Sequence, residues 1–334
     1  MNKLNVLITG SGSLYGSAII QSLLKSTLSL HLVAIDIHAH TLGLHLAHRG
    51  YLVPPVKEEQ SYLKRLFQII HKENIHAIFI ASSQELPFYS QYKSAIESET
   101  GAKVFTHTAE VYSICSDKWK TVNFLKERYF QYPKTIRYPE DKDQIESFLN
   151  NVGFPVILKP RRGKGSEDVH VAPDLSNLHQ LLPGKNDMII QQYLPDDQNE
   201  FTVGICCGTN GEILSAIALN RRLQDGITIA AKSDYYPEIT ELCKQVAKSL
   251  HLTGPCNFQL RLLKGKPVIF EINPRFSSTT GMRTLLGINE PEILLKADLL
   301  GEKIPNLKIL KSYVIRQYAD YLVPVEQIEK LEEQ

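Results

Sequence analysis

Three polar residues in the last third of the chain have the types and spacing of a metal site. Glu271 and Asn273 lie two positions apart at the end of an apolar run, so on a β-strand their side chains share one face. Gln259 lies on the preceding run and can point from the same face. Carboxylate and amide oxygens suit Mg²⁺, which takes its remaining ligands from water and phosphates. The alternative is that all three are ordinary polar residues at strand ends.

A lysine and the loop after it have the pattern of a phosphate-binding segment. Lys159 ends the apolar run 154–158 and precedes a polar loop that contains Gly163, Lys164 and Gly165. Backbone N–H groups of a glycine loop beside a lysine can bind a polyphosphate. A solvated basic loop is the alternative.

A third segment has the features of a nucleoside contact. An apolar run leads into Gln191, Gln192, Tyr193 and Leu194, and Glu200 follows six residues later. The main chain of this segment could contact a purine, and Glu200 could accept hydrogen bonds from ribose hydroxyls. By itself the segment is also consistent with a core strand.

A glycine turn near the N-terminus is open to three interpretations. Gly10, Ser11, Gly12 and Gly16 follow an apolar run and precede a helical pattern, and Asp36 ends the next apolar run. The turn could bind a dinucleotide, although its G-x-G-x-x-x-G spacing departs from the usual fingerprint. It could instead bind an anionic or amino-acid-like substrate at the helix N-terminus, or be a structural tight turn.

The elements around these residues predict an α/β protein. Strand-like and helical runs alternate over residues 1–115, which is typical of a doubly wound, Rossmann-like αβα domain with a parallel sheet. A second unit is expected over 116–310, with a small α+β module at about 133–191 that could move as a lid. Strands dominate after residue 200, and a strand and a charged helix are expected in 311–334.

Composition excludes several classes of protein. The chain has 334 residues, 43% of them apolar and 22% charged, so we expect two or three folded domains rather than disorder. The formal charge of +1 provides no basic field for nucleic acid or an anionic membrane. No apolar stretch approaches the roughly 18 residues of a membrane span. The five cysteines form no CxxC pair, so we expect reduced core residues and a cytoplasmic location.

The order of these motifs resembles the ATP-grasp superfamily over nearly the whole chain. The resemblance rests on Lys118, on Lys159 with its loop, on 191–194 with Glu200, and on 271–275 preceded by Gln259. Segments 116–119, 153–155, 254–259 and 270–275 are similar to the carbamoyl-phosphate-synthase-like branch. The resemblance implies a Rossmann-like domain followed by a two-lobed α+β ATP-grasp domain, with ATP and Mg²⁺ or Mn²⁺ as cofactors.

The resemblance also implies a role for each motif residue. Lys118 and Lys159 would hold the nucleotide phosphates, and Gly163, Lys164 and Gly165 would close over them. The hinge of Gln191, Gln192, Tyr193 and Leu194 would contact adenine, with Gln192 where a glutamate is common, and Glu200 would bind the ribose. Gln259, Glu271 and Asn273 would bind the metal, and Arg275 would neutralise the transferring phosphoryl group. Lys159 and Arg275 are thus the catalytic candidates.

The activity implied is an ATP-dependent ligase that activates a small carboxylate as an acyl phosphate and joins it to an amine. A bicarbonate- or carbamate-phosphorylating enzyme and a nucleotide-binding regulatory protein are the alternatives. For the substrates we single out Arg222 and Lys232, which could also be exposed loop cations, the hydroxyl residues Ser277, Ser278, Thr279 and Thr280, and the turn of Gly10, Ser11 and Gly12. The expected partners are small molecules, and an apolar first-domain surface favours a homodimer.

Overall fold

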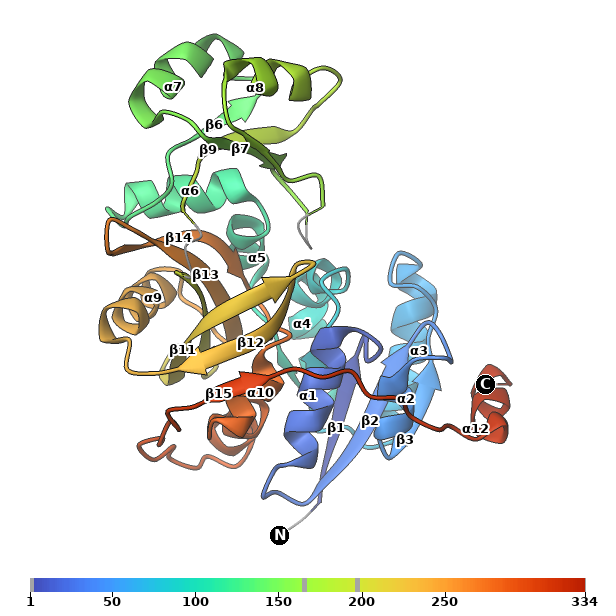
Figure 1. The fold of residues 1–334 in the computed structure, drawn as a ribbon. Coiled ribbons are helices and arrows are strands. Elements are labelled where there is room, and N and C mark those ends of the chain that lie inside the picture. The colour runs from blue at the N-terminus through green and yellow to red at the C-terminus, as the bar shows by residue number, and fades with distance from the viewer. Residues whose placement is uncertain (1–2, 164–166, 196–198, 334) are drawn as a thin grey trace.

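The computed structural model describes residues 3–163, 167–195 and 199–333 (Figure 1). The N-terminal part contains a five-stranded sheet in the order β3-β2-β1-β4-β5, and its neighbouring strands are parallel. Its elements are β1 (Leu4–Thr9), α1 (Leu14–Leu24), β2 (Leu30–Asp36), α2 (Leu42–Leu46), β3 (Arg49–Leu52), α3 (Glu59–Lys72), β4 (Ala77–Ile80), α4 (Leu86–Thr100) and β5 (Lys103–Phe105).

Helices cover both faces of this sheet. Consecutive side chains of a strand point to opposite faces, so Val6 and Ile8 of β1 join the core that includes Ile19 of α1. Leu7 joins a second core, which includes Leu66 of α3. The doubly wound parallel architecture that the alternating runs predict is confirmed.

A small α+β unit follows two connecting helices, α5 (Ala109–Cys115) and α6 (Lys118–Glu127). Its four-stranded antiparallel sheet has the order β6-β9-β7-β8 and its own small apolar core. Figure 1 shows the unit standing apart from the first sheet, with α7 and α8 on its outer side. Its elements are β6 (Thr135–Tyr138), η1 (Lys142–Gln144), α7 (Ile145–Val152), β7 (Val156–Pro160), β8 (His170–Ala172), α8 (Leu175–Leu181) and β9 (Met188–Gln192).

The largest sheet is antiparallel and has the strand order β14-β13-β10-β11-β12-β15. On β10, Phe201 and Val203 face the core under α9, so Glu200, Thr202 and Gly204 face the opposite side. Its strands and the helix that covers it are β10 (Glu200–Cys207), β11 (Ile213–Gln224), β12 (Ile227–Ser233), α9 (Pro237–Ser249), β13 (Pro255–Leu263), β14 (Lys266–Asn273) and β15 (Tyr313–Ile315).

Helices after β14 join this sheet to the N-terminal domain. They are α10 (Thr280–Leu285), α11 (Glu290–Leu294) and the π-helical turn η2 (Leu295–Leu299). Met282 and Leu294 share one apolar core with Ile19 of α1, so the first and third sheets belong to a continuous body. The chain then crosses that body to α12 (Val325–Glu332) (Figure 1).

Two features of composition can be checked against the structure. All five cysteines are buried free thiols, as the sequence predicts. Within the described ranges, no helix combines the length and the apolar character that a membrane crossing requires.

Candidate functional site

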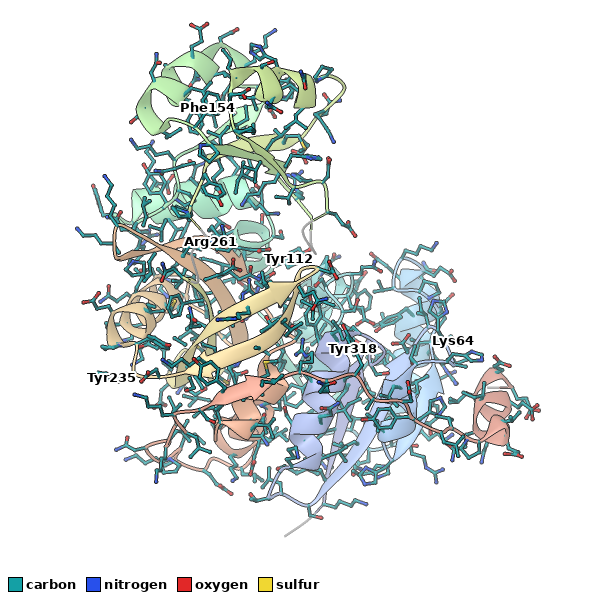
Figure 2. All side chains as sticks on the ribbon, viewed as in Figure 1. Lys64, Tyr112, Phe154, Tyr235, Arg261 and Tyr318 are labelled. Atoms are coloured by element: carbon teal, nitrogen blue, oxygen red, sulfur yellow. The ribbon has the colours of Figure 1, made fainter. Side chains whose placement is uncertain are left out.

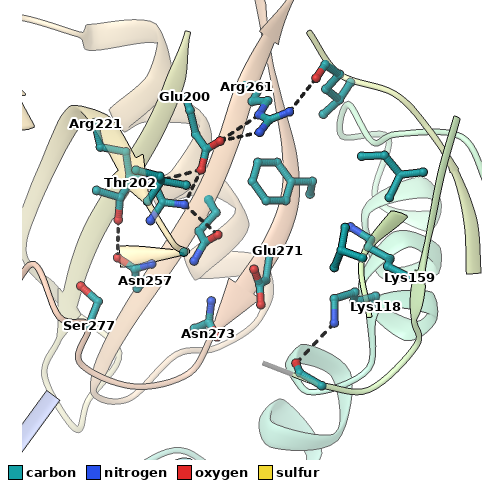
Figure 3. Close-up of a pocket in the computed structure, with 18 of the residues that line it drawn as sticks. Lys118, Lys159, Glu200, Thr202, Arg221, Asn257, Arg261, Glu271, Asn273 and Ser277 are labelled. Atoms are coloured by element: carbon teal, nitrogen blue, oxygen red, sulfur yellow. Dashed lines mark hydrogen bonds and ion pairs between the residues drawn. The ribbon is translucent and has the colours of Figure 1, made fainter. Parts of the chain in front are cut away.

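A cleft lies between the small α+β unit and the inner face of the six-stranded sheet (Figure 3). Its empty volume is about 1250 Å³, including the solvent at its mouth. The hairpin of β13 and β14 forms the floor, and it pairs Gln259 with Glu271 and Asn257 with Asn273. Cross-strand partners point to the same face, so the polar side chains predicted to converge do converge here.

The opposite wall supplies two lysines. Lys159 ends β7 and is buried, with its Nζ 5.6 Å from the centroid of the Phe270 ring. Burial, reinforced by the charges of Lys118 and Arg261 and opposed by Glu271, lowers the pKa of Lys159 to about 8. Lys118 begins α6, and its Nζ donates to the Gly163 carbonyl at 3.4 Å. Figure 3 shows both lysines across the cleft from Glu271.

The first residues of the loop after Lys159, Arg161 and Arg162, are anchored rather than freely solvated. Asp117 caps α6 by accepting hydrogen bonds from the backbone of Trp119 and Lys120. The same buried carboxylate forms ion pairs with Arg161 at 2.8 Å and with Arg162 at 3.3 Å. Residues 161–162 and the start of α6 are therefore tied together.

Glu200 lies at the centre of a charged cluster. Arg261 donates to its Oε2 from Nε at 2.9 Å and from Nη2 at 2.7 Å, and Arg221 donates to its Oε1 from Nε at 3.0 Å and from Nη2. Burial by itself raises the pKa of the Glu200 carboxyl, but the two guanidinium groups bring this pKa below its ordinary value. Glu200 is thus an ionised carboxylate with both oxygens engaged.

The two arginines also reach the hinge and the metal candidates. Arg261 donates from Nη1 to the Leu194 carbonyl at 2.8 Å, and Arg221 donates from Nη2 to Gln259 Oε1 at 3.0 Å. Figure 2 places Arg261 beneath the small α+β unit, and Tyr235 and Tyr318 are exposed.

The donor set fits a hard divalent cation. Glu271 has no hydrogen bond or ion pair from the residues that the structure describes, so its carboxylate faces the cleft unengaged. Asn273 Oδ1 accepts from Arg275 Nη2 at 3.0 Å, and Gln259 Oε1 accepts from Arg221. Because an amide oxygen has two lone pairs, each can still bind a metal. One carboxylate and two amides are oxygen ligands suited to Mg²⁺.

Arg275 joins the floor to the N-terminal domain. It is 7% exposed, and its guanidinium carbon lies 4.2 Å from the centroid of the Tyr15 ring. Its Nη1 donates to the Phe276 carbonyl at 2.9 Å. Tyr15 lies between Gly12 and Gly16 in the first turn of α1, and Ser13 caps this helix by accepting from Gly16 N. The turn therefore presents a tyrosine to the cleft.

Most of the predicted site residues line this one cleft. They are Lys118, Lys159, Gly163, Gln191, Gln192, Leu194, Glu200, Gln259, Glu271, Asn273, Arg275, Ser277, Ser278 and Thr279. Tyr193 does not line it, and Lys164 and Gly165 lie outside the described residues. In the hinge, Gln192 N donates to the Lys134 carbonyl at 2.8 Å.

Two of the predicted substrate residues lie on the wrong face of the sheet. Phe201, which faces the core under α9, pairs with Asn220, and Asn220 pairs with Lys232. Lys232 therefore points away from the cleft, where it forms an ion pair with Asp234 at 3.2 Å. Arg222 is exposed and lies on the same face as Asn220. The structure thus contradicts their placement in the cleft.

The glycine turn itself is also away from the cleft lining. Gly10, Ser11 and Gly12 do not line the cleft. Gly12 N donates to Asp36 Oδ2 at 2.7 Å, so the acid expected to bind a ribose in a dinucleotide fold instead holds the turn. Gly10 has a φ of +52°, and a Cβ there would lie 2.6 Å from Ser82 Cβ. The structural interpretation of the turn fits these contacts.

Sequence reasoning missed Tyr15, Arg221, Arg261 and Phe270. Arg261 could have been found, because it lies two positions beyond Gln259 on the same strand. Arg221 could not be separated from Arg222 without knowing the register of β11.

Comparisons with known proteins agree with this geometry. Residues 184–320 match the family described as ATP-grasp in the biosynthetic pathway with Ter operon. The formate-dependent phosphoribosylglycinamide formyltransferase of Prochlorococcus marinus (strain MIT 9301) is 24% identical over 348 residues, covering 97% of this chain and 84% of that protein. The carbamoyl phosphate synthase large chain of Helicobacter pylori (strain J99) is 22% identical over 270 residues, covering 75% of this chain and 24% of that protein.

Solved structures show the same fold. N5-carboxyaminoimidazole synthetase from Staphylococcus aureus has a TM-score of 0.71 and 18% identity, covering 92% of this chain and 80% of that chain. L-amino acid ligase from Bacillus licheniformis has a TM-score of 0.65 and 16% identity, covering 89% of this chain and 74% of that chain. The family match over residues 184–320, the sequence relatives and the shared fold together make this chain similar to ATP-grasp enzymes.

Proposed function

We propose that this protein is an ATP-dependent ligase that activates a small-molecule carboxylate as an acyl phosphate and joins it to an amine. The observation that carries the proposal is the cleft itself, in which Lys118 and Lys159 face Glu271 and Asn273, with Arg275 beside them. Cations on one wall and oxygen ligands on the other suit a metal-bound polyphosphate.

The nucleotide is assigned to the part of the cleft next to the small α+β unit. Lys118, Lys159 and Gly163 bind its phosphates, and Lys164 and Gly165, outside the described residues, are assigned the same role. The hinge from Gln191 to Leu194 receives the adenine. Glu200 is assigned to the ribose, whose hydroxyls would have to displace part of the hydrogen bonds from Arg221 and Arg261 that occupy both carboxylate oxygens. We assign residues 1–115 to the substrate side and about 133–191 to a lid.

Gln259, Glu271 and Asn273 would hold Mg²⁺, which neutralises phosphate charge when bound. In the chemical step, a carboxylate oxygen of the substrate attacks the γ-phosphorus of ATP, and the bond to the β–γ bridging oxygen breaks to release ADP. Arg275 and Lys159 offset the negative charge that spreads over the transferring group. The amine nitrogen then attacks the acyl carbon, the C–O bond to phosphate breaks, and the amine loses a proton.

The relatives support carboxylate activation. Formate, which the formyltransferases use by name, is a carboxylate, and an L-amino acid ligase by name joins amino acids. The carbamoyl phosphate synthase match keeps bicarbonate as the second candidate for the activated acid. For assembly, a homodimer stays a prediction, which light scattering of the purified protein would test.

The experiment is quantification of nucleotide products after incubation with MgATP and separate pools of carboxylates, amines and bicarbonate. We expect ADP formation that requires one carboxylate and one amine pool. ADP formation with bicarbonate alone would favour the second candidate, and AMP would contradict the acyl-phosphate route. MgADP binding by calorimetry shows whether the nucleotide site is intact: if every pool fails while MgADP binds tightly, a missing substrate and the regulatory alternative are the two choices left.

A further inference from the structure

The largest fully buried side chain in the described structure is an arginine, Arg283 on α10. It is 1% exposed and forms an ion pair with Glu290, also 1% exposed, at 2.8 Å between Nη2 and Oε2. Such pairs are common at surfaces, but removing both charges from water is costly.

The pair is not built for maximal stability. Arg283 Nε and Glu290 Oε1 have no hydrogen-bond partner among the described residues. Both lie against Gly204 of β10, where a Cβ would be 2.4 Å from Arg283 Nε and 2.3 Å from Glu290 Oε1. The ion pair thus requires a glycine on the strand and leaves two buried polar atoms unsatisfied, which is unfavourable.

The rest of the guanidinium group organises the chain that follows Arg275. Nη1 donates to Ser277 Oγ at 3.0 Å and to Thr279 Oγ1 at 2.7 Å, and Nη2 donates to Thr280 Oγ1 at 3.0 Å. Ser277 and Thr279 both line the cleft. Arg283 therefore lies behind two residues that line the cleft and donates hydrogen bonds to both of them.

The hydrogen bonds fix which way the two hydroxyl protons point. Ser277 Oγ and Thr279 Oγ1 are 2.7 Å apart, and Ser277 Oγ already accepts from Thr279 N at 3.2 Å and from Arg283 Nη1, so the Ser277 hydroxyl donates to Thr279 Oγ1 and the second hydroxyl is that of Thr279. Each oxygen also accepts from Arg283, so neither hydroxyl can donate to the guanidinium group. The second hydroxyl proton then has no acceptor within the described part of the chain. It remains available to an oxygen atom in the cleft.

We propose that Arg283, held by Glu290, is a positioning residue that makes the Ser277–Thr279 hydroxyl pair a donor to an anionic oxygen of the substrate. The ligand class is a carboxylate or phosphoryl oxyanion bound beside Arg275. The inference rests on the proposed function and adds the residue pair that fixes the orientation of the Ser277 and Thr279 hydroxyls.

The test uses the full chain loaded with MgADP and calorimetric titration with inorganic phosphate in one arm and formate in the other. The double variant Arg283→Met/Glu290→Leu removes both charges and avoids a lone buried ion. Gly204→Ala adds a Cβ on β10 that would clash with Arg283 Nε and Glu290 Oε1, so the ion pair must shift. Cys207→Ala is the matched control, because Cys207 lies on the opposite face of β10 in the core under α9.

We expect both test variants to bind MgADP as the wild type does and to bind at least one anion about tenfold more weakly, the effect of one lost hydrogen bond to a charged group. Weaker binding of phosphate identifies a phosphoryl ligand, and weaker binding of formate identifies a carboxylate ligand. Unchanged anion binding, or equal loss of MgADP and anion binding, would overturn the inference. If the double variant does not fold, Gly204→Ala decides.

Failure of the proposed function has a different signature. A wild-type protein that does not bind MgADP contradicts the nucleotide site. A wild-type protein that binds MgADP but neither anion contradicts only the role of Arg283. A third variant, Arg283→Lys, keeps a positive charge opposite Glu290 but loses the forked donors of the guanidinium group. We expect it to fold and, like the other two variants, to bind the anion weakly.

Discussion

The guanidinium group of Arg275 lies over the ring of Tyr15, with 4.2 Å between the guanidinium carbon and the ring centroid. Tyr15 OH also accepts from Arg275 Nη2 at 3.4 Å. Tyr15 is 260 residues away in sequence, in the first turn of α1. The N-terminal domain therefore contacts the proposed phosphoryl-transfer site through an aromatic ring.

Replacing Tyr15 tests whether this contact orients Arg275. Tyr15→Leu removes a cation–π contact of about 0.5–2 kcal/mol, so we expect kcat to fall about 2- to 30-fold. Tyr15→Phe keeps the ring and should stay close to the wild type. MgADP affinity should not change, because Tyr15 lies away from the hinge. The exposed neighbour Leu14 provides the control Leu14→Ala, and equal kcat for Tyr15→Leu and the wild type would refute the role.

The Glu200 cluster makes a prediction about stability. Glu200→Gln leaves Arg221 and Arg261 facing a neutral amide, and breaking a buried ion pair costs about 3–5 kcal/mol. We expect the free energy of unfolding, measured by urea denaturation at pH 7, to fall by that order. The exposed pair of Glu241 and Lys244 is the control, because its loss should change stability by less than about 1 kcal/mol.

The same cluster sets a pH dependence. Because the pKa of Glu200 is lower when folded than when unfolded, its stabilising contribution is present above the unfolded value, about 4.3. The contribution is lost as the pH falls through the folded pKa. Below a pH of about 4.3, the free energy of unfolding of Glu200→Gln should therefore fall less steeply with acid than that of the wild type. Parallel acid-denaturation curves would argue against the ionised carboxylate.

Lys159 makes the nucleotide affinity depend on alkaline pH. Its pKa of about 8 in the free protein means that the ammonium is charged below this value and becomes neutral above it. Bound phosphates favour the charged form, so MgADP affinity should fall by up to about tenfold per pH unit above about 8. Lys159→Arg stays protonated and should give a flat profile. A flat wild-type profile would contradict the phosphate contact.

A second consequence of the Lys159 pKa concerns the nucleotide-free protein. Between pH of about 8 and the unfolded value of about 10.4, the unfolded chain binds more protons than the folded one. The contribution of Lys159 to the free energy of unfolding therefore rises with pH between these two values. Lys159→Met should be more thermostable than the wild type at pH 7 while losing MgADP binding, which differential scanning calorimetry and calorimetric titration would show.

The hairpin at the cleft floor was predictable because its signals are local. Apolar alternation with period two set the shared face of Glu271 and Asn273, and the turn Lys264-Gly265 joined the strands. Both turn residues have positive φ. The turn alone would set Gln259 opposite Phe270, and a β-bulge between Gln259 and Leu260 shifts the register by one residue, so that Gln259 falls opposite Glu271.

The arginines of β11 were not predictable in the same way. The apolar run ends at Asn220, but β11 continues to Gln224 and turns at Asp225-Gly226, both with positive φ. Asp-Gly is a strong hairpin signal, and reading it would have placed β12. A register shift between Arg222 and Leu223 further obscures the alternation. Which arginine faces the cleft depends on pairing with β10, a long-range contact that no local pattern contains.

Glu271 makes the sharpest prediction for the metal. It is the only carboxylate in the proposed ligand set, so Glu271→Gln keeps the shape of the side chain and removes the charge that a divalent cation needs. We expect turnover to fall by at least about a hundredfold, as for loss of a group that stabilises transition-state charge. Electron paramagnetic resonance of Mn²⁺ titrated into the ADP-loaded protein should show weaker metal binding. The exposed Glu212→Gln provides a control of equal charge change. Metal binding that matches the wild type would contradict the assignment. Glu271 also raises the pKa of Lys159, so in Glu271→Gln the pH above which MgADP affinity declines should be lower than in the wild type.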